Sequence, residues 1–454
     1  MTINQIQIKK QDRWRNHFMK KTMIVLLSLS VLGLTACGAA NQPAGNTDAG
    51  KTAEKPSQTT QAEQKPVTLS VWTTNKDLLA DQVKAFEAKY PTIKIKAEFM
   101  GGYDEMAQKV MAAVVSNTLP NVVQLGQRHG IPQMADSGKL IPIEQFMSEQ
   151  EKTDVYPAFW DRFRYKDKLW TIPYNSSTPM LYYNKTLFDQ AGLKAPNTWD
   201  ELVKAAQTLT KDTNGDGKVD VWGFNTAADS PWYVQPMTWN RGGSIVDKAG
   251  KVTVNSKEAV EVLKSFQDLV HVQKAMAPNQ HNTAEQDFSA GKLAMIYKSG
   301  SALAGTQKEV GQKFEIGVAY LPMIKDRNVP IGGNSLGIFK SDPDVEKASW
   351  TFVSFLTNTE NAAATSISTG YAPIKKSATE TEAFKKKMSE DPNFKIIMDQ
   401  NQFLRGQGIH PADSLIWSGL VTALETVEGD AKADPQKVLD KLQADVDSFM
   451  KSYK

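Results

Sequence analysis

The run Gly333-Asn334-Ser335-Leu336-Gly337 has the spacing of a nucleophile elbow, in which a serine attacks the substrate of a hydrolase. Such an elbow needs a strand before it and a helix directly after it, whereas Ile338 and Phe339 continue an apolar strand pattern. His410 is the histidine downstream that could act as a base, and it lies in a glycine-rich stretch. The pattern keeps an extracellular hydrolase of phosphoesters or glycans as an alternative, but the sequence favours a protein without catalytic activity.

An acidic run is the second group of residues that could do chemistry. The oxygen ligands at positions one, three, five, seven and nine of an EF-hand calcium loop would come from Asp212, Asn214, Asp216, Lys218 and Asp220. Position twelve is Gly223, where an EF-hand has a bidentate glutamate. The same residues also suit a tight Asn-Gly and Asp-Gly turn without metal. Both a structural calcium ion and a plain turn stay open, and neither is a reaction centre.

Other metal, redox and nucleotide motifs are missing from the sequence. It holds five histidines and one cysteine, with no His-x-x-x-His or Cys-x-x-Cys pair and no Gly-x-x-x-x-Gly-Lys loop. We therefore expect no cofactor apart from the calcium ion considered above.

Aromatic and hydroxyl side chains gather instead in turn-rich segments. Trp232 and Trp239 lie where loops rather than core helices are expected, and aromatic faces pack on sugars and polyols, although a single tryptophan is more often core. Ser177 and Ser299 follow apparent strand ends, and Ser299 opens an expected helix. Free N–H groups at a helix start suit an anion, while plain N-capping would use the same serine.

The first 36 residues are predicted to be an export signal. Met23–Leu34 is an uncharged, mostly apolar run behind Lys20 and Lys21, too short to span a bilayer as a mature helix. The only cysteine, Cys37, follows in Leu34-Thr35-Ala36-Cys37-Gly38, which resembles the lipobox of bacterial lipoproteins. In that class the cysteine carries lipid, and several acyl chains give a permanent anchor. We expect an exported protein that lipid holds at the extracellular face of the cell membrane.

A linker and a change of charge follow from this cleavage. Residues 37–66 contain no aromatic side chain and no Ile, Leu or Val, which predicts a disordered spacer after the lipidated cysteine. The residues before Cys37 carry six Lys or Arg and one Asp, so removing their +5 from the formal +3 leaves the mature chain near −2. This charge does not point to nucleic acid as a partner.

Strands and helices alternate from Val67 onward. The expected order begins with strand, helix, strand, helix and strand over 67–73, 77–90, 93–99, 103–116 and 121–125. It restarts with a strand at 180–183 and a helix that Thr198 and Glu201 begin as a capping box. Alternating elements predict an α/β fold with parallel-rich sheets, and a folded part of about 390 residues exceeds one core, so two lobes are expected. Ligands bind beyond the carboxyl ends of such strands, which predicts a cleft between the lobes.

The chain from about Val67 to its C-terminus resembles the extracellular solute-binding proteins of sugar-type ABC importers (family 1), and among them those that bind glycerol 3-phosphate. The resemblance is carried by 173–185 (PYNSSTPMLYYNK), 331–336 (IGGNSL) and 369–374 (TGYAPI). It implies a two-lobe periplasmic-binding-protein-like fold with a hinged cleft. Lobe 1 would comprise 67–175 and 336–371, and lobe 2 would comprise 176–335 and 372–454. The implied function is capture of a small polar ligand for ABC permease subunits, without catalysis.

The resemblance also implies the ligand contacts. They fall on Tyr103, Gln127, Ser177, Trp232, Ser299, Gly333 and Tyr371, with Trp239 as a possible second tryptophan and Arg405 as a candidate for the arginine of the phosphate side. Gln127 replaces a carboxylate of the family, which keeps an acceptor but loses the charge. Glycerol 3-phosphate, a glycerophosphodiester and a neutral oligosaccharide all stay open as ligands.

Overall fold

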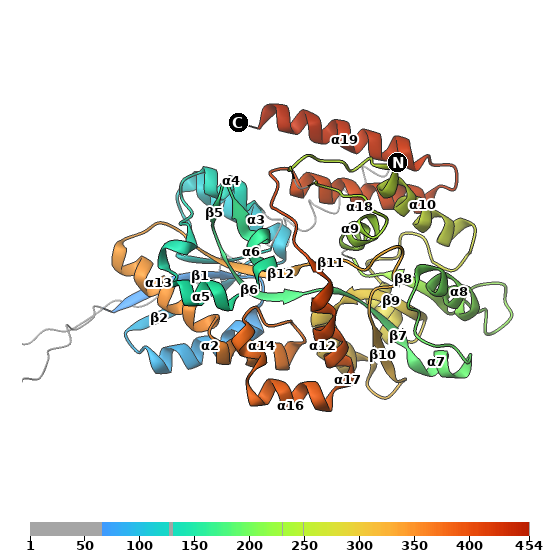
Figure 1. Cartoon of the computed structure of the whole chain (residues 1–454), viewed down its shortest axis with the longest axis horizontal. Helices are drawn as coiled ribbons and strands as arrows, with labels where there is room; N and C mark the ends of the chain where they lie inside the picture. Colours follow the sequence, from blue (N-terminus) through green and yellow to red (C-terminus); the bar gives the residue numbers. More distant parts are fainter. Residues whose placement is uncertain (1–65, 127–129, 229, 248, 454) are drawn as a thin grey trace, which may run out of the picture. The chain divides into compact units, whose positions relative to one another are not determined.

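The protein is described by a computed structural model that covers residues 66–126, 130–228, 230–247 and 249–453 (Figure 1). All of them belong to the unit Glu63–Lys454. The predictions for the signal, Cys37, the linker up to residue 65 and Gln127 lie outside the described residues. Among the helices that are described, none combines the length and the apolar character needed to cross a bilayer.

The first lobe is built on a five-stranded sheet of order β2-β1-β3-β12-β6. Its strands are β1 (Val67–Thr73), β2 (Ile93–Phe99), β3 (Val122–Gly126), β6 (Ile172–Ser177) and β12 (Gly332–Ile338). The first three are parallel because α2 (Lys76–Lys89) and α3 (Tyr103–Ser116) carry the chain back between them. β12 runs antiparallel to both β3 and β6.

Helices cover both faces of this sheet. On one face α2 and α13 (Pro343–Leu356) bring together Phe86 and Phe352, whose ring centroids are 4.9 Å apart. On the other face lie α3, α4 (Ile131–Asp136) and α6 (Pro157–Phe163). Val122 joins the first cluster and Val123 the second, as expected for successive residues of a strand.

The second lobe is built on a four-stranded sheet of order β10-β7-β9-β8. Its strands are β7 (Pro179–Asn184), β8 (Trp222–Thr226), β9 (Leu293–Ser299) and β10 (Ile316–Ala319), of which only β8 and β9 pair in parallel. The predicted capping box at α8 (Trp199–Leu209) is confirmed, since Thr198 Oγ1 accepts from Glu201 N at 3.3 Å and the Glu201 carboxylate accepts from Thr198 N at 3.1 Å.

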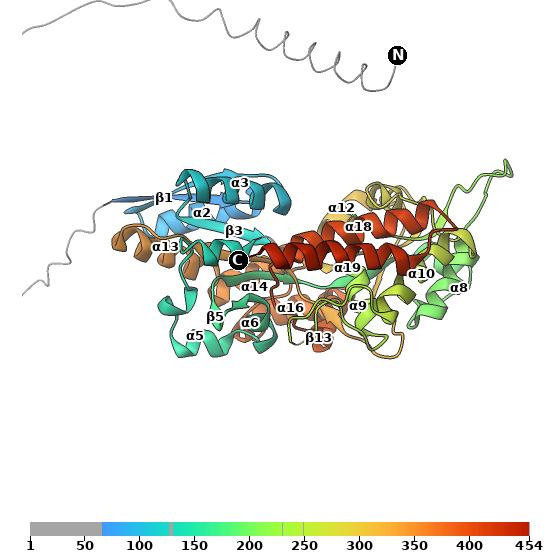
Figure 2. The same cartoon turned by 90° about the horizontal axis from the view of Figure 1, so that it is seen from above.

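A pair of C-terminal helices completes the second lobe. α18 (Asp413–Gly429) and α19 (Pro435–Ser452) lie side by side and pack with α10 (Lys257–His271) on the same core as β7, β8 and β9 (Figures 1 and 2). The remaining elements are α5 (Glu149–Asp154), α7 (Lys185–Gln190), α11 (Ala284–Ser289), α12 (Leu303–Val310), α14 (Thr359–Thr369), α15 (Lys376–Thr379), α16 (Glu382–Glu390), α17 (Pro392–Asp399), the short strands β4 (Arg164–Tyr165), β5 (Lys168–Leu169), β11 (Val329–Pro330) and β13 (Leu404–Arg405), and the 3₁₀ turns η1 (Ile143–Phe146), η2 (Gly300–Ala302) and η3 (Gln400–Phe403).

The two sheets are joined at strand ends. Thr178 alone separates β6 of the first sheet from β7 of the second. Ala372, just after α14, exchanges two backbone hydrogen bonds with Ser176, of 3.3 Å and 2.7 Å. The α/β two-lobe fold is confirmed, with sheets that mix parallel and antiparallel pairs because the chain passes between the sheets. The residue boundaries given for the lobes stay predictions.

The prediction of loops around Trp232 and Trp239 is wrong, because Pro231–Trp239 forms the helix α9. Pro231 suits the first turn of a helix, where its missing N–H would have had no partner. Every residue of α9 except Gln235 is buried. Burial against the second core therefore outweighs the poor helix propensity of this aromatic and proline-rich segment.

Candidate functional site

The backbones of β6 and β12 approach each other closely where they leave the first lobe. Gly332, Gly333 and Asn334 pair with Ser177, Ser176 and Asn175. Gly333 has a φ of +98°, and a Cβ atom built there would lie 2.4 Å from the carbonyl oxygen of Asn175. Only glycine fits this position, which accounts for the second glycine of the Gly-Gly pair.

Gly332 makes room for the indole of Trp232. A Cβ atom at Gly332 would lie 2.4 Å from the ring of Trp232 and 2.6 Å from Ser177 Oγ. The ring is 5% exposed, and its Nε1 has no hydrogen-bond partner among the described residues. The structure thus brings together two predicted contacts, Ser177 and Trp232, that lie far apart in the sequence.

Asn334 belongs to the same group, although the sequence reasoning missed it. Its side-chain Nδ2 donates to the Tyr103 hydroxyl at 3.1 Å, and its backbone N–H donates to Asn175 Oδ1 at 3.2 Å. Tyr103 is the first residue of α3, so Asn334 ties that helix to the crossing strands. A signal was present in the sequence, because Asn334 directly follows the Gly-Gly pair that the resemblance had singled out.

Several buried polar atoms at this place lack partners. Ser176 Oγ, Trp232 Nε1 and Asn334 Oδ1 are buried and have no hydrogen-bond partner among the described residues. An unsatisfied buried polar group costs about 1 to 3 kcal/mol, so proteins rarely keep several without a purpose. A polar molecule that donates to Asn334 Oδ1 and accepts from Trp232 Nε1 would satisfy two of these three atoms.

Ser299 and Tyr371 come from two turns that touch. Ser299 Oγ accepts from Ser301 N at 3.3 Å, so it caps η2 as plain N-capping predicts. The turn before Tyr371 packs closely against the turn after Ser299. A Cβ atom built at Gly370 would lie only 2.9 Å from the carbonyl oxygen of Gly300.

Arg405 lies over Trp239. The guanidinium carbon is 4.7 Å from the centroid of the indole, within the range of a cation–π contact. Burial lowers the pKa of the Arg405 guanidinium, and the carboxylate of Asp326 opposes that shift. Arg405 pairs with Pro330, two residues before Gly332, so this pair borders the Trp232 group.

Arg241, the other arginine considered for an anion, is turned toward α10. Its Nη1 donates to Met237 O at 3.1 Å and its Nη2 to Ser265 Oγ at 2.8 Å. Its guanidinium is also 3.9 Å from the Glu261 carboxylate. Because these contacts occupy the guanidinium of Arg241, Arg405 is better placed than Arg241 to bind an anionic ligand.

The two alternative motifs have ordinary structural surroundings. Ser335 lies inside β12, which continues to Ile338, so the Gly333–Gly337 run is not the strand-to-helix turn of a nucleophile elbow. His410 Nδ1 accepts from Ala412 N, and the same histidine borders a hollow of about 450 Å³ that contains none of the predicted ligand contacts.

The acidic loop 212–220 is exposed and closed by its own hydrogen bonds. Asp212 accepts from the backbone N–H groups of Gly215 and Gly217, at 2.7 and 2.8 Å, and Asp220 accepts from Thr213. Within the part of the chain that the structure describes, no three His, Cys, Asp or Glu side chains gather to hold a metal ion. Calcium at this loop stays a prediction.

Two sheets joined at strand ends, with hydroxyl, amide and indole groups at the crossing, define a solute-binding protein. The family of bacterial extracellular solute-binding proteins matches residues 81–395, well over half of the chain, and the chain belongs to this family. It is an extracellular solute-binding protein, as its resemblance predicts.

Similar proteins include the sn-glycerol-3-phosphate-binding periplasmic protein UgpB of Rhizobium meliloti, 28% identical over 319 residues, which cover 67% of this chain and 74% of that protein. UgpB of Escherichia coli O1:K1 / APEC is 28% identical over 313 residues, 64% of this chain and 70% of that protein. The crystal structure of UgpB from Mycobacterium tuberculosis in complex with glycerophosphocholine has a TM-score of 0.76 at 26% identity and covers 85% of this chain and 98% of that one.

A further similar structure supports the fold alone. The ABC substrate-binding protein Lmo0181 from Listeria monocytogenes, in complex with cycloalternan, has a TM-score of 0.74 at 22% identity and covers 86% of this chain and 100% of that one.

Proposed function

We propose that this protein captures glycerol 3-phosphate or a glycerophosphodiester and delivers it to the permease subunits of an ABC importer, without altering it chemically. The observation that carries the proposal is the group of unpaired buried atoms, Trp232 Nε1 and Asn334 Oδ1, beside Ser177 and Tyr103. Such a set suits the hydroxyl groups of a glycerol unit, because each hydroxyl both donates and accepts. The similarity to two UgpB proteins and to the glycerophosphocholine complex supports the same ligand class.

Arg405 is the proposed contact for the phosphate. A phosphate that leaves water must meet N–H groups and at least one cation, since an unpaired buried charge is costly. Ser299 at the start of η2 and the backbone near Gly333 would supply the neutral donors. Arg405 borders this group through its pairing with Pro330, and its guanidinium carbon lies 4.7 Å from the centroid of the Trp239 indole.

A neutral oligosaccharide is the second candidate. It is favoured by Gln127, which stands where the family has a carboxylate, and by Arg405 being already engaged with Trp239 and Asp326. A sugar needs hydroxyl-matching groups and an aromatic face but no cation, so the two candidates differ in their dependence on charge.

Calorimetry distinguishes the phosphate ligands from the neutral oligosaccharide by measuring the binding of three probes: glycerol 3-phosphate, glycerophosphocholine and maltotriose. Wild type, Arg405→Ala and Arg241→Ala are compared, with Arg241 as the matched control because it is held by α10. Loss of a charge-assisted contact should cost about 2 to 5 kcal/mol in binding of the phosphate probes, and only in Arg405→Ala. Binding of maltotriose alone would overturn the phosphate proposal. Conversion of any labelled probe to a product would overturn the proposal that the protein is not an enzyme.

We also propose the membrane anchor at Cys37. Export suits an extracellular solute-binding protein, and the lone cysteine directly after the apolar run has no second cysteine with which to form a disulfide. Cys37→Ser should release or misprocess the protein, as fractionation and metabolic labelling with a fatty acid would report. A wild-type chain that is free in the medium with an intact thiol would contradict the anchor.

A further inference from the structure

Residues 404–413, here called the strap, connect η3 to α18 and run between elements of both lobes (Figure 1). The strap begins as β13, where Arg405 covers Trp239 at the end of α9 in the second lobe. It ends at Asp413, the first residue of α18, which is part of the same lobe. Between these points it accepts hydrogen bonds from two helices of the first lobe, α4 and α6.

Two side chains of the first lobe hold the backbone of the strap. Arg162 on α6 is 5% exposed, and its Nη1 donates to the carbonyl oxygens of Gln407 and Gly408 at 3.2 and 3.3 Å. Gln133 on α4 donates from Nε2 to the carbonyl oxygen of Pro411 at 3.1 Å. Burial lowers the pKa of the Arg162 guanidinium, and the carboxylate of Asp413 opposes that shift, so the buried cation faces an anion from the second lobe.

Ile409 adds an apolar contact. Its side chain packs against the first-lobe cluster that contains Met106 of α3, Met134 of α4 and Phe163 of α6. α3 is the helix that begins with Tyr103, whose hydroxyl meets Asn334. The strap therefore joins Trp239 of α9 to the first-lobe cluster to which α3, the helix that begins with Tyr103, contributes Met106.

The helix pair α18 and α19, which follows the strap, makes a separate contact with the first lobe at the end of α19. The hydroxyl of Tyr453, directly after α19, donates to Asp136 Oδ2 at 3.2 Å. Asp136 is the last residue of α4, the helix that also carries Gln133. The start of α18 and the end of α19 thus both meet the helices around α4.

We propose that the strap is a clasp between the lobes, that Arg162 is the residue that positions it, and that its contacts set how slowly bound ligand leaves. Separation of the lobes at this side must break the bonds from Arg162 and Gln133 and expose Ile409 to water. A conformational equilibrium shifts by the difference in interaction free energy between its states, so these contacts favour the state with the lobes together. The last part of the proposal rests on the proposed function, whereas the clasp itself does not.

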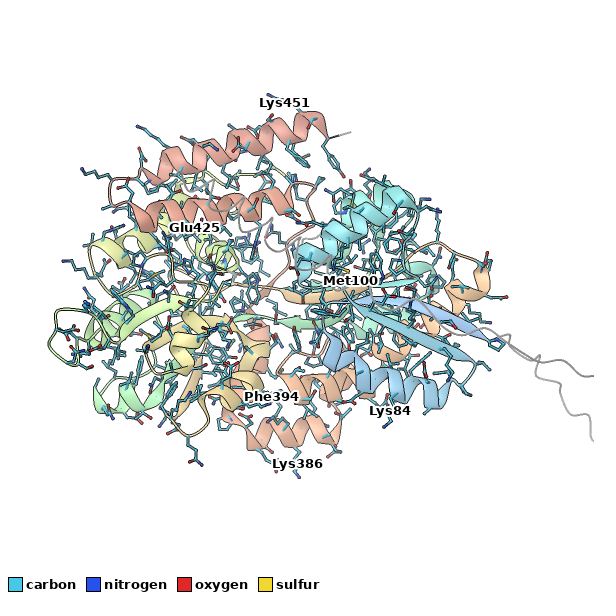
Figure 3. The ribbon with its side chains drawn as sticks, turned by 180° about the vertical axis from the view of Figure 1, so that it is seen from behind. Lys84, Met100, Lys386, Phe394, Glu425 and Lys451 are labelled. Atoms are coloured by element: carbon cyan, nitrogen blue, oxygen red, sulfur yellow. The ribbon has the colours of Figure 1, made fainter. Side chains whose placement is uncertain are left out.

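The clasp is tested without ligand by a distance between the lobes. Spin labels are placed at Val115→Cys on α3, which is 88% exposed, and at Glu425→Cys on α18, whose exposed side chain is labelled in Figure 3, in a chain that also carries Cys37→Ser. Pulsed electron paramagnetic resonance then measures the distance between the two labels in wild type, Arg162→Lys and Ile409→Ala. Arg164→Lys and Ile396→Ala are the matched controls, since Arg164 is exposed and bonds within its own hairpin and Ile396 packs away from the strap.

A longer and broader distance distribution in Arg162→Lys and Ile409→Ala, with unchanged controls, is the expected result. Gln133→Ala serves as a third variant should Arg162→Lys fail to fold. An unchanged distribution in the folded variants would overturn the clasp, even if their melting temperatures fall, because a merely structural role moves stability but not the distance.

The second arm measures dissociation of glycerophosphocholine and maltotriose by stopped flow. Dissociation of the probe that binds should be about tenfold faster in Arg162→Lys and Ile409→Ala, a change of about 1.4 kcal/mol. Unchanged dissociation despite a longer distance would overturn the link to ligand release. If wild type binds neither probe, the proposed function fails while the distance measurement still decides the clasp.

Discussion

The side-chain amide of Asn334 on β12 donates a hydrogen bond of 3.1 Å to the hydroxyl of Tyr103 at the start of α3. This bond uses the Nδ2 atom of Asn334 and leaves its buried Oδ1 without a partner among the described residues. The asparagine is therefore half satisfied by the protein, and its oxygen is available to a hydroxyl or N–H group of a ligand.

Replacement of Asn334 by Ala should weaken binding more than it weakens the fold. The substitution removes one hydrogen bond to Tyr103 and one unsatisfied acceptor, effects of opposite sign of about 1 kcal/mol each on stability. Affinity for the ligand should fall about tenfold, because the contact to the ligand is lost outright. Calorimetry and thermal unfolding of the same samples check this. Unchanged affinity would remove Asn334 from the site.

Trp232→Phe should reduce affinity and abolish most of the fluorescence change on ligand binding. The phenyl ring still packs on Gly332 but has no N–H to donate, and a neutral hydrogen bond contributes about 0.5 to 1.5 kcal/mol. Trp232→Ala is less informative, because removing a buried indole costs about 3 to 5 kcal/mol of stability. Trp350→Phe is the control, because its indole stacks on Phe146 in the first lobe. A full fluorescence response in Trp232→Phe would assign the signal to another tryptophan.

Gly333→Ala should destabilise the protein far more than Gly138→Ala. Both glycines have positive φ, +98° and +70°, but only at Gly333 would a new Cβ atom meet backbone, 2.4 Å from Asn175 O, whereas nothing lies within 4 Å of it at Gly138. Backbone strain alone costs about 1 to 3 kcal/mol, and the clash at Gly333 adds to it. Denaturant unfolding measures both. Equal losses would show that β6 moves freely to admit the methyl group.

Acid should weaken the contact between α4 and the end of α19. Burial acts to raise the pKa of the Asp136 carboxyl, but hydrogen bonds from Lys166, Tyr165 and Tyr453 outweigh it, so the pKa lies below its usual range. A carboxyl whose folded pKa is depressed stabilises the fold above its unfolded pKa of about 3.9, and that contribution is lost as pH falls through the folded pKa. Asp136→Asn should therefore lose less stability than wild type between about pH 6 and about pH 2, values roughly two units above and below the unfolded pKa, as urea unfolding at each pH would report. A parallel decline in both proteins would contradict this role for Asp136.

Calcium, if the loop 212–220 binds it, should raise the melting temperature and leave ligand affinity unchanged. Binding to the folded state alone stabilises by RT ln(1 + [L]/Kd), about 2.7 kcal/mol at a hundredfold excess over Kd. Asp212→Asn and Asp220→Asn should remove the effect. A melting temperature that responds to neither calcium nor chelator would favour the plain turn, whose hydrogen bonds are complete without metal.

Local pattern was sufficient to define the elements at the start of each lobe. The predicted strands 67–73 and 93–99 and the predicted helix 103–116 have the bounds of β1, β2 and α3. The capping box of Thr198 and Glu201 begins α8 as predicted. These signals are local, since hydrophobic period and capping chemistry act over a few neighbouring residues. The strand predicted at 180–183 is longer, Pro179–Asn184, because Pro179 pairs with Ser299 of β9 and Asn184 with Ile316 of β10.

Only the tertiary structure decided that α9 is a helix and which distant residues meet at the candidate site. α9 is a helix because its aromatic and proline residues are buried by other elements, a cause that no local window contains. The sequence named Ser177, Trp232 and Gly333 through a family resemblance, but only pairing of β6 with β12 brings them together and adds Asn334. Likewise, Arg162 and the strap lie 245 residues apart in sequence and meet only in the folded chain. Short-range chemistry thus determined the elements, whereas contacts between distant segments, which depend on how whole faces pack, decided the site.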